Sequence, residues 1–287
     1  MFELERPTPI MRKVLSAVNT GDILSLAISL EGISTKELNA PFFLSKRTIP
    51  TTLMMEAAKH GDGEVIEFLT SRGVKAYKGV SIRRKSLLSW FSRKVYPLDK
   101  ACKRREGSSV VKSLLQAGAM PTIAALDTAI HEMAWETVEE ILRDERLDLP
   151  YIFDKEGKTL CIALCRMAAS GREDLVLRVL ECDLPVHKLR NRGSVLLNHA
   201  CSSGHLEIVK KLADSGVDVN KPGLNRETPL IVATLNENLD VIKCLCEYNV
   251  DPRVIHLKKY TARQLSKSAD ITEYLESYEK HWKRRKK

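Results

Sequence analysis

A few residues in this chain have types and spacings that could support chemistry. Gly157-Lys158-Thr159 has the ending of a phosphate-binding loop, in which backbone amides and a lysine hold phosphate groups. The full motif also needs a glycine five residues before Gly157, where Ile152 stands. No strand is expected before the motif either. We therefore expect neither a nucleotide site nor any other bound cofactor.

Thiols are the next candidates, because cysteine is a common zinc ligand. Cys161 and Cys165 lie four residues apart, and Cys244 and Cys246 two apart. No histidine or further cysteine completes a tetrahedral set near either pair. We expect no metal site and interpret these cysteines as buried small apolar residues.

Histidines and sequence motifs offer no catalytic site. His60 and His205 stand beside glycines, where a turn is expected, and we interpret them as partners of neighbouring loops. The patterns HExxH, GxSxG and GxGxxG do not occur. The chain is therefore not expected to be an enzyme.

Composition predicts a folded chain with an excess of positive charge. The 287 residues are 44% hydrophobic and 29% charged, and the formal net charge is +9. That hydrophobic share can build a sizeable core. No signal segment and no run of about 18 apolar residues is found. The seven cysteines are therefore expected to be reduced thiols of an intracellular protein, located in the cytoplasm, the nucleus or both.

The positive charge is concentrated in residues 75–105, which we call the basic finger. It contains eleven Lys or Arg residues and a single acid, Asp99. Tyr77, Trp90 and Phe91 lie among them. Three interpretations stay open: a mobile solvated loop, a site for an acidic protein segment, or a site for nucleic acid or an anionic membrane surface. Phosphorylation of serines within the finger could switch such a site off; they are Ser81, Ser86, Ser89 and Ser92.

An internal repeat decides the expected fold. An offset of 33 residues carries Leu197 to Leu230 and Ala200 to Ala233. In each unit a helix is expected to begin at a threonine cap followed by proline, as in Thr228-Pro229. Each unit therefore reads as two helices and a loop, and stacked units share one core.

These residues resemble the ankyrin repeat family. The best matches are Gly204-His205 with the aliphatic residues that follow it, and Thr228-Pro229-Leu230 with Ala233. Further matches lie at residues 56–62 and 114–119. The resemblance implies an all-α ankyrin-repeat solenoid that binds protein partners and performs no catalysis.

We expect one repeat domain over residues 1–280 and a basic tail over 281–287. About eight helix-pair units are expected, around residues 10–32, 50–73, 96–119, 123–148, 157–184, 193–220, 226–252 and 260–279. Their anchors are Ala17, Ala57, Ala101, Ala129, Leu164, Ala200, Ala233 and Ser266. The tail reads as an anion-binding or nuclear-import cluster, as a solvated helix end, or as the cut edge of a longer protein.

Two connections are longer than the repeat needs. Gly73 and Pro97 are 24 residues apart, against 13 for Gly216 and Pro229. The connection after Gly32 is also long, and its aromatic pair, residues 42–43, either packs on the first unit or offers an apolar contact. Loop extensions on one face of a repeat protein are often its binding face.

The sequence thus predicts a scaffold or adaptor that binds a partner protein through the concave face and the basic finger. The residues expected to bind the partner are Arg83, Arg84, Lys85, Trp90, Phe91, Lys103 and Arg104. The alternatives are a binder of nucleic acid or an anionic surface, and a targeting domain of a larger enzyme or host-directed effector. A monomer is expected, and the resemblance implies Asn220 as a residue that could be hydroxylated.

Overall fold

The computed structural model describes residues 7–44, 50–85, 90–182, 184, 191–223, 227–255 and 260–285. The chain divides into two compact units, Met1–Leu147 and Asp148–Lys287. Each unit holds four helix pairs within its described residues. The prediction of an all-α repeat with about eight helix pairs is therefore confirmed.

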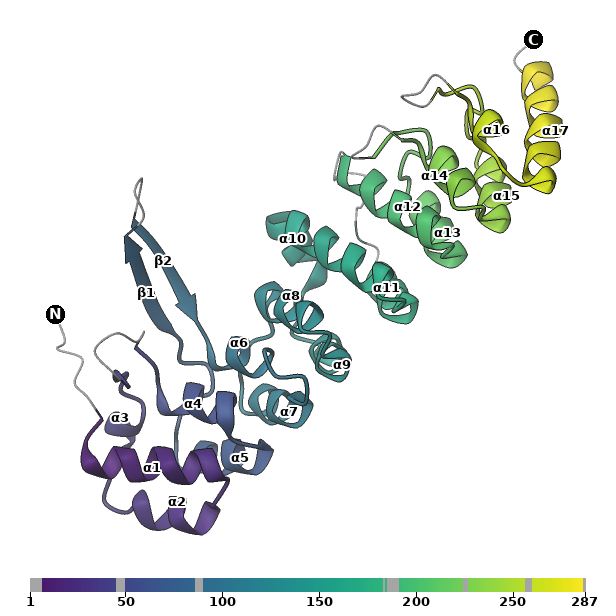
Figure 1. Cartoon of the computed structure of the whole chain (residues 1–287). Helices are drawn as coiled ribbons and strands as arrows, with labels where there is room; N and C mark the ends of the chain where they lie inside the picture. The colour runs from purple at the N-terminus through teal and green to yellow at the C-terminus, as the bar shows by residue number, and fades with distance from the viewer. Residues whose placement is uncertain are drawn as a thin grey trace. The chain divides into compact units, whose positions relative to one another are not determined.

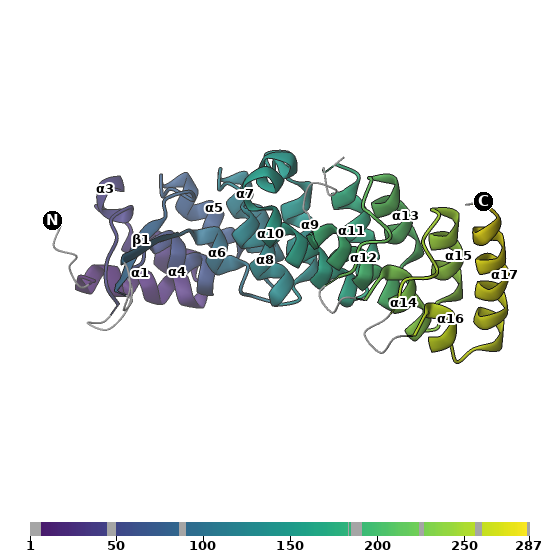
Figure 2. The same cartoon turned by 90° about the horizontal axis from the view of Figure 1, so that it is seen from above.

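In the first unit, one strand pair interrupts a series of short helices (Figure 1). α4 packs beside α6 and α5 beside α7, so first and second helices form two rows (Figure 2). The elements are α1 Pro9–Thr20, α2 Ile23–Ser29, α3 Thr35–Leu38, α4 Leu53–His60, α5 Gly63–Ser71, β1 Val80–Lys85, β2 Trp90–Val95, α6 Pro97–Ala101, α7 Ser108–Gln116, α8 Ile123–His131 and α9 Trp135–Arg143.

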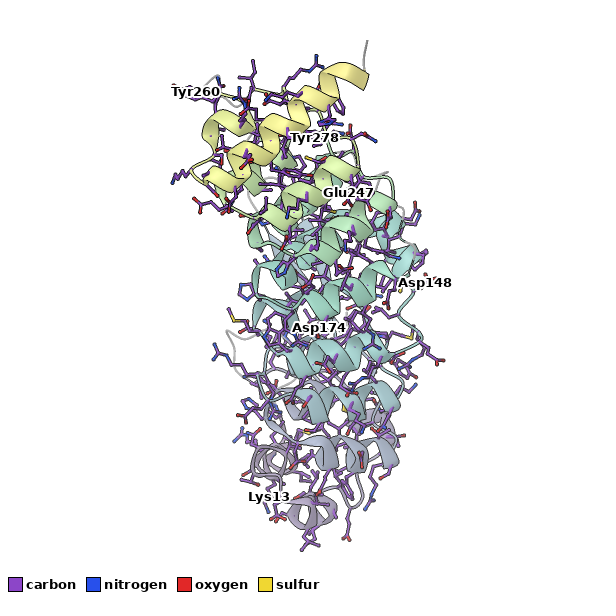
Figure 3. The ribbon with its side chains drawn as sticks, turned by 90° about the vertical axis from the view of Figure 1, so that its right-hand side faces the viewer. Lys13, Asp148, Asp174, Glu247, Tyr260 and Tyr278 are labelled. Atoms are coloured by element: carbon purple, nitrogen blue, oxygen red, sulfur yellow. The ribbon has the colours of Figure 1, made fainter. Side chains whose placement is uncertain are left out.

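The second unit repeats the helix pair and ends in a long helix. Tyr278 lies on that last helix, and its hydroxyl donates to the Val250 carbonyl oxygen at 3.0 Å (Figure 3). The elements are α10 Leu149–Ala169, α11 Glu173–Leu180, α12 Asn191–Ser203, α13 Leu206–Asp214, α14 Pro229–Leu235, α15 Leu239–Glu247, α16 Ala262–Leu265 and α17 Ala269–Arg285.

Threonine side chains begin several of the first helices. Thr8, Thr52, Thr122 and Thr228 each accept a hydrogen bond from the backbone N–H three residues on. The hydroxyl satisfies an amide that the helix itself leaves unpaired. Pro229 follows Thr228 as the first helical residue, where its missing N–H costs nothing. The predicted Thr228-Pro229 helix start is therefore confirmed.

Small residues on the first helices let neighbouring pairs pack closely. Seven of the eight predicted anchors are buried, at no more than 5% exposure, and they are Ala17, Ala57, Ala101, Ala129, Leu164, Ala200 and Ala233. The eighth, Ser266, is half-buried and follows the short helix α16. The core is thus a continuous layer within each unit, built from positions that recur along the repeat.

The basic finger is not the loop that the sequence predicts. Residues 80–85 and 90–95 form the antiparallel strands β1 and β2, with Val80 opposite Val95 and Lys85 opposite Trp90. Valine, isoleucine and aromatic residues favour strands. The runs of basic residues beside them concealed this preference. The two strands project from the helices α4 and α6 (Figure 1).

Helix α10 consists of two helical segments that meet at a kink directly before Gly157, near which a unit is predicted to begin. α10 begins at Leu149, where the Asp148 side chain accepts from the Tyr151 N–H at 2.9 Å. The helix runs on through a non-helical residue, Glu156, at φ −129° and ψ 27°. Gly157-Lys158-Thr159 therefore begins the second helical segment, directly after this kink.

Candidate protein-interaction surface

The hairpin of β1 and β2 rises from an anchored base. Val80 is buried, and a Cβ on Gly79 would lie 2.7 Å from the Tyr96 ring. Glycine thus lets the ring lie against the backbone. Tyr96 in turn leads into α6, where the Asp99 carboxylate accepts from the Tyr96 N–H at 3.0 Å. The strand pair is therefore tied directly to the first helix of the next repeat.

A lysine cluster lies on α4, on α6 and just past α6, beside the helices from which the hairpin projects. It consists of Lys59, Lys100 and Lys103. Burial lowers the pKa of Lys100, and the positive charges of Lys103 and Lys59 lower it further. A lowered lysine pKa shows that the ammonium form is poorly compensated where it stands. An anion approaching this cluster would relieve that repulsion.

Glu56 is the buried carboxylate beside the lysine cluster. It is 7% exposed, and its Oε1 accepts from the Thr51 hydroxyl at 2.7 Å. His60 Nε2 lies 3.9 Å from its other oxygen. The negative charge of Glu56 raises the pKa of Lys100 but does not outweigh burial and the neighbouring lysines. The cluster therefore keeps an unbalanced positive charge.

The seven residues predicted to bind a partner fall into two groups. Arg83, Arg84 and Lys85 lie on β1, and Trp90 and Phe91 on β2. Only their backbone belongs to the part of the chain that the structure describes; their side chains do not. The other two lie just past α6 and are described below.

Lys103 and Arg104 differ in their surroundings. Lys103 is exposed, whereas Arg104 is half-buried and donates a hydrogen bond from its guanidinium to the Gly61 carbonyl oxygen. That bond links two successive helix pairs, so Arg104 has a structural role as well. The sequence analysis counted Lys100 among the eleven basic residues of the basic finger but not among the expected binding residues, and it did not single out Lys59. Neither stands out from ordinary helix-surface lysines until the fold brings them together.

The first helices of the second unit expose a different set of side chains. Ile162 on α10 and Leu235 on α14 are 42% and 40% exposed, and His199 on α12 is exposed as well. These side chains lie on the first helices of their pairs. They carry no concentrated charge, in contrast to the lysine cluster of the first unit.

His205 links two successive repeats through its imidazole ring. Its Nε2 lies 2.9 Å from the Ala168 carbonyl oxygen and its Nδ1 3.6 Å from a Glu173 carboxylate oxygen. His60 instead faces Glu56 of its own helix. His205 thus contacts the helices of the preceding repeat and not a loop, whereas His60 lies near an acid one turn back on α4. A loop contact of His60 stays a prediction.

The cysteines are mostly packed inside the helix pairs. Burial raises the pKa of Cys165 and of Cys246, each to about 12. Cys161, Cys201 and Cys244 are buried as well, whereas Cys182 is exposed. Among the described residues, no group of histidine, cysteine, aspartate or glutamate has the arrangement of a metal site. No described helix is long and apolar enough to cross a membrane.

Asn220 joins two successive loops. Its Oδ1 accepts from the Asp251 N–H at 2.6 Å, and its own N–H donates to the Asp218 carboxylate at 2.9 Å. Asn220 is half-buried. Both bonds give it a structural role in the stack, and its hydroxylation stays a prediction.

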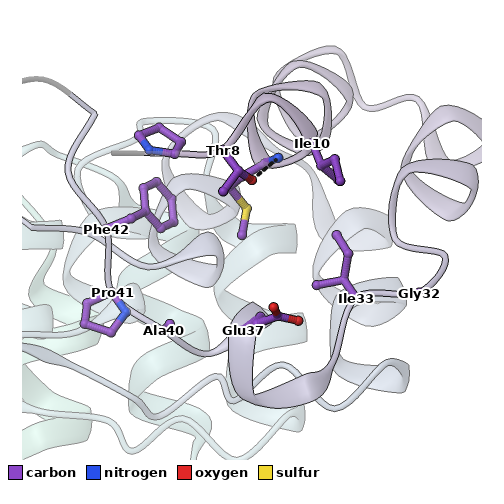
Figure 4. A pocket seen from close by; sticks show the side chains of 10 residues that line it. Thr8, Ile10, Gly32, Ile33, Glu37, Ala40, Pro41 and Phe42 are labelled. Atoms are coloured by element: carbon purple, nitrogen blue, oxygen red, sulfur yellow. Dashed lines mark hydrogen bonds between the residues drawn. The ribbon is translucent and has the colours of Figure 1, made fainter. Parts of the chain in front are cut away.

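The first insertion packs against the start of the chain. Phe42 is 7% exposed and pairs with Thr51 through two backbone hydrogen bonds of 2.9 Å. It lines a pocket of about 450 Å³ with Ile10 and Ile33 (Figure 4). Glu37 lies at this pocket, but its carboxylate accepts from the Ser34 N–H and hydroxyl. The apolar aromatic therefore packs on the first unit.

The basic tail begins within α17. That helix continues to Arg285, and the His281 Nδ1 lies 2.8 Å from the Ser277 carbonyl oxygen. Trp282 packs against Tyr278, with ring centroids 6.0 Å apart. The described part of the tail is thus the end of the last helix; residues 286–287 lie outside the described residues.

Comparisons with known proteins agree with the repeat anatomy. Residues 160–256 match the family model described as ankyrin repeats (3 copies). Human BCL-6 corepressor-like protein 1 is 32% identical over 123 residues, which cover 42% of this chain and 7% of that protein. An ankyrin repeat-containing protein of Schizosaccharomyces pombe is 28% identical over 116 residues, covering 39% of this chain and 55% of that protein. The aligned part thus spans a small fraction of the human relative.

A solved structure also resembles the chain at low identity. The ankyrin repeat domain of Bcl-3, titled a unique member of the IkappaB protein family, superposes with a TM-score of 0.45 and 17% identity. The match covers 92% of this chain and 97% of that one.

Within residues 160–256, α14 begins at Thr228-Pro229, the first helices pack through Leu164, Ala200 and Ala233, and the left-handed Gly171, Gly204 and Gly216 follow helices. Over residues 160–256 the chain therefore consists of ankyrin repeats, and the described helix pairs outside this range continue the same all-α repeat fold.

Proposed function

We propose that this chain is a non-catalytic interaction scaffold whose basic surface binds an acidic segment of a partner protein. That surface comprises the basic finger and the lysine cluster. The observation that carries the proposal is the concentration of charge in residues 75–105, which hold eleven Lys or Arg residues and a single acid. The lowered pKa of Lys100, caused by burial and by the charges of Lys103 and Lys59, supports it. A carboxylate placed there would be attracted at short range and would steer the encounter at long range.

The rest of the molecule supplies an adaptor's rigidity. Ankyrin repeats generally mediate protein–protein interactions, and a preformed surface loses little conformational entropy on binding. The exposed Ile162 and Leu235 offer apolar contacts on the concave face of the second unit. We propose that a partner engages both the first-helix row and the basic finger, and that the chain acts as a monomer in the cytoplasm or nucleus. The likeness to a protein named as a corepressor-like protein supports the nuclear option.

One observation favours a second candidate, binding to nucleic acid. The basic finger forms a two-stranded ribbon, and such a ribbon fits the major groove of a duplex. Its basic residues would then contact phosphates, with a steep dependence on salt. The measurement below separates this candidate from the first.

A direct binding measurement tests the proposal. A fluorescein-labelled peptide of twelve glutamates is titrated with the whole chain at about physiological salt, and anisotropy reports the affinity. The finger variant Arg83→Glu, Arg84→Glu, Lys85→Glu is expected to bind about tenfold or more weakly, because three attractive charges become repulsive. The variant Lys59→Gln, Lys103→Gln tests the lysine cluster in the same way.

A matched control corrects for net charge. The triple variant Lys158→Glu, Lys243→Glu, Lys267→Glu changes three exposed lysines of the second unit by the same total charge. It is expected to bind within about twofold of the wild type. An equal loss in both triple variants would contradict a localised site. Duplex DNA is then added as a competitor. If it displaces the peptide when the concentration of DNA phosphates is lower than that of peptide carboxylates, the second candidate is favoured.

A further inference from the structure

The ribbon of β1 and β2 has backbone edges that no third strand covers. In the part of the chain that the structure describes, the sheet contains these two strands alone. Each strand is six residues long and pairs with the other along one side. The N–H and C=O groups on the opposite side of each strand point outward. Such an edge is a ready template for another extended chain.

The ribbon is held in place rather than hanging from a flexible stem. Val80 is 8% exposed, and the Tyr96 ring lies against Gly79 at the base. The Lys75 N–H, just before the ribbon, donates to the Asn39 side-chain oxygen at 2.8 Å. An anchored strand loses little entropy when a further strand pairs with it.

The charge of the ribbon selects which strand can add. The ribbon contains five basic residues, which are Arg83, Arg84, Lys85, Arg93 and Lys94, and no acidic residue. Two copies of this edge would bring like charges together, which is how natural edges avoid pairing with themselves. A strand rich in acidic residues would meet the opposite charge instead.

The alternation of side chains along each strand also sets the spacing of the acidic residues that a partner strand would need. Residues 83 and 85 lie on one face of the ribbon and residue 84 on the other, because successive strand residues alternate. Carboxylates at every second position of a partner strand would therefore meet the basic residues of one face. Apolar β-branched residues between them would suit the other positions.

We propose that an extended acidic segment of the partner protein pairs with a free edge of the β1–β2 ribbon through main-chain hydrogen bonds. This inference rests on the proposed function and specifies how the partner is held. Main-chain bonds supply affinity, and the basic side chains supply the preference for acid.

Two charge-matched peptides test it on the whole chain. One alternates glutamate with valine, and the other alternates glutamate with proline, which has no N–H to donate and does not form central strands. The valine peptide is expected to bind about tenfold or more tightly, since several main-chain bonds are lost with proline. The Arg83→Glu, Arg84→Glu, Lys85→Glu variant should weaken the valine peptide, and the Lys158→Glu, Lys243→Glu, Lys267→Glu variant should not.

Amide hydrogen exchange gives an independent readout. At saturation with the valine peptide, outward N–H groups of Val80–Lys85 or Trp90–Val95 should become protected. Equal affinity for both peptides, without added protection in either strand, would overturn strand pairing while leaving the proposed function intact. Failure of both peptides to bind would overturn the inference and the proposed function together. If duplex DNA displaces the valine peptide when the concentration of DNA phosphates is lower than that of peptide carboxylates, the choice of a protein partner would be overturned.

Discussion

The side-chain amide of Asn39 holds the backbone on both sides of Val74. Its Nδ2 donates to the Gly73 carbonyl oxygen at 2.9 Å, and its Oδ1 accepts from the Lys75 N–H at 2.8 Å. Asn39 itself belongs to the first insertion and is 7% exposed. The first insertion therefore fixes the path by which the chain enters the basic finger.

Replacing Asn39 with alanine should destabilise the first unit. Asn39→Ala removes two hydrogen bonds and leaves a partly buried carbonyl and a partly buried N–H without their partner, which costs about 2 kcal/mol. Urea denaturation measures the change. Asn19→Ala, at an exposed position of α1, serves as control and is expected to change stability by less than about 0.5 kcal/mol. Equal effects of the two substitutions would contradict the role given to Asn39.

Several features of the fold could be predicted from the sequence because they depend on local chemistry. Thr228-Pro229 begins α14 as expected, and Gly204 and Gly216 adopt φ of 77° and 80° after their helices. A threonine cap and a left-handed glycine act within a few residues of one another. The repeat then copies such signals along the chain.

Other features depend on contacts that the sequence does not display. The pairing of β1 with β2 requires residues 80 and 95 to meet, and a run of basic residues obscures their strand preference. The lysine cluster likewise depends on the fold, which brings Lys59 of one helix pair near Lys100 of the next. Of the expected site, the sequence located the basic finger but could not show that Arg104 also bonds Gly61.

The sequence also could not predict the left-handed backbone conformation of two residues, because neither of them is a glycine. Met133 and Glu237 have φ of 56° and 58°, where the corresponding residues after α10 and α12 are Gly171 and Gly204. A residue with a Cβ is strained in this conformation. We expect Met133→Gly and Glu237→Gly each to stabilise the chain by about 1 kcal/mol, measured by thermal or urea unfolding.

The reverse substitution provides the control for this prediction. Gly171 has φ of 73°, and a Cβ there would meet no atom within 4 Å. Gly171→Ala should therefore cost about 1 kcal/mol through backbone strain alone. Met133→Ala keeps the strain and should gain nothing. A destabilised Met133→Gly variant would show that the Met133 side chain matters more than its backbone.

Thiol reactivity should single out Cys182. It is exposed, whereas burial raises the pKa of Cys165 and of Cys246 to about 12. The thiolate is the reactive form, so the half-buried Cys165 and the buried Cys246 stay protonated and unreactive well above the usual cysteine pKa of about 8.5. Alkylation at about pH 8, read by mass spectrometry, should modify Cys182 first, and Cys182→Ser should abolish the fast phase. Fast labelling of Cys165 or Cys246 in the folded chain would contradict the packing.

Lys100 should give acidic-peptide binding a characteristic dependence on pH. Burial and the charges of Lys103 and Lys59 lower its pKa from 10.5, so it loses its proton at a lower pH than an ordinary lysine. Only the charged form attracts a carboxylate. As the pH rises, affinity for the glutamate peptide should therefore begin to weaken before pH 10.5 is reached. The total loss of affinity should be about three- to fivefold.

Arginine at the same position separates this effect from general alkaline weakening. Lys100→Arg keeps its charge across this range, because the guanidinium has a pKa above about 12, and its affinity should stay level where the wild type weakens. Lys112→Arg, at an exposed position of α7, is the matched control and should follow the wild type. Anisotropy titrations at a series of pH values measure all three. Identical profiles for the wild type and Lys100→Arg would show that Lys100 does not contact the bound acid, and the lysine cluster would lose its place in the site.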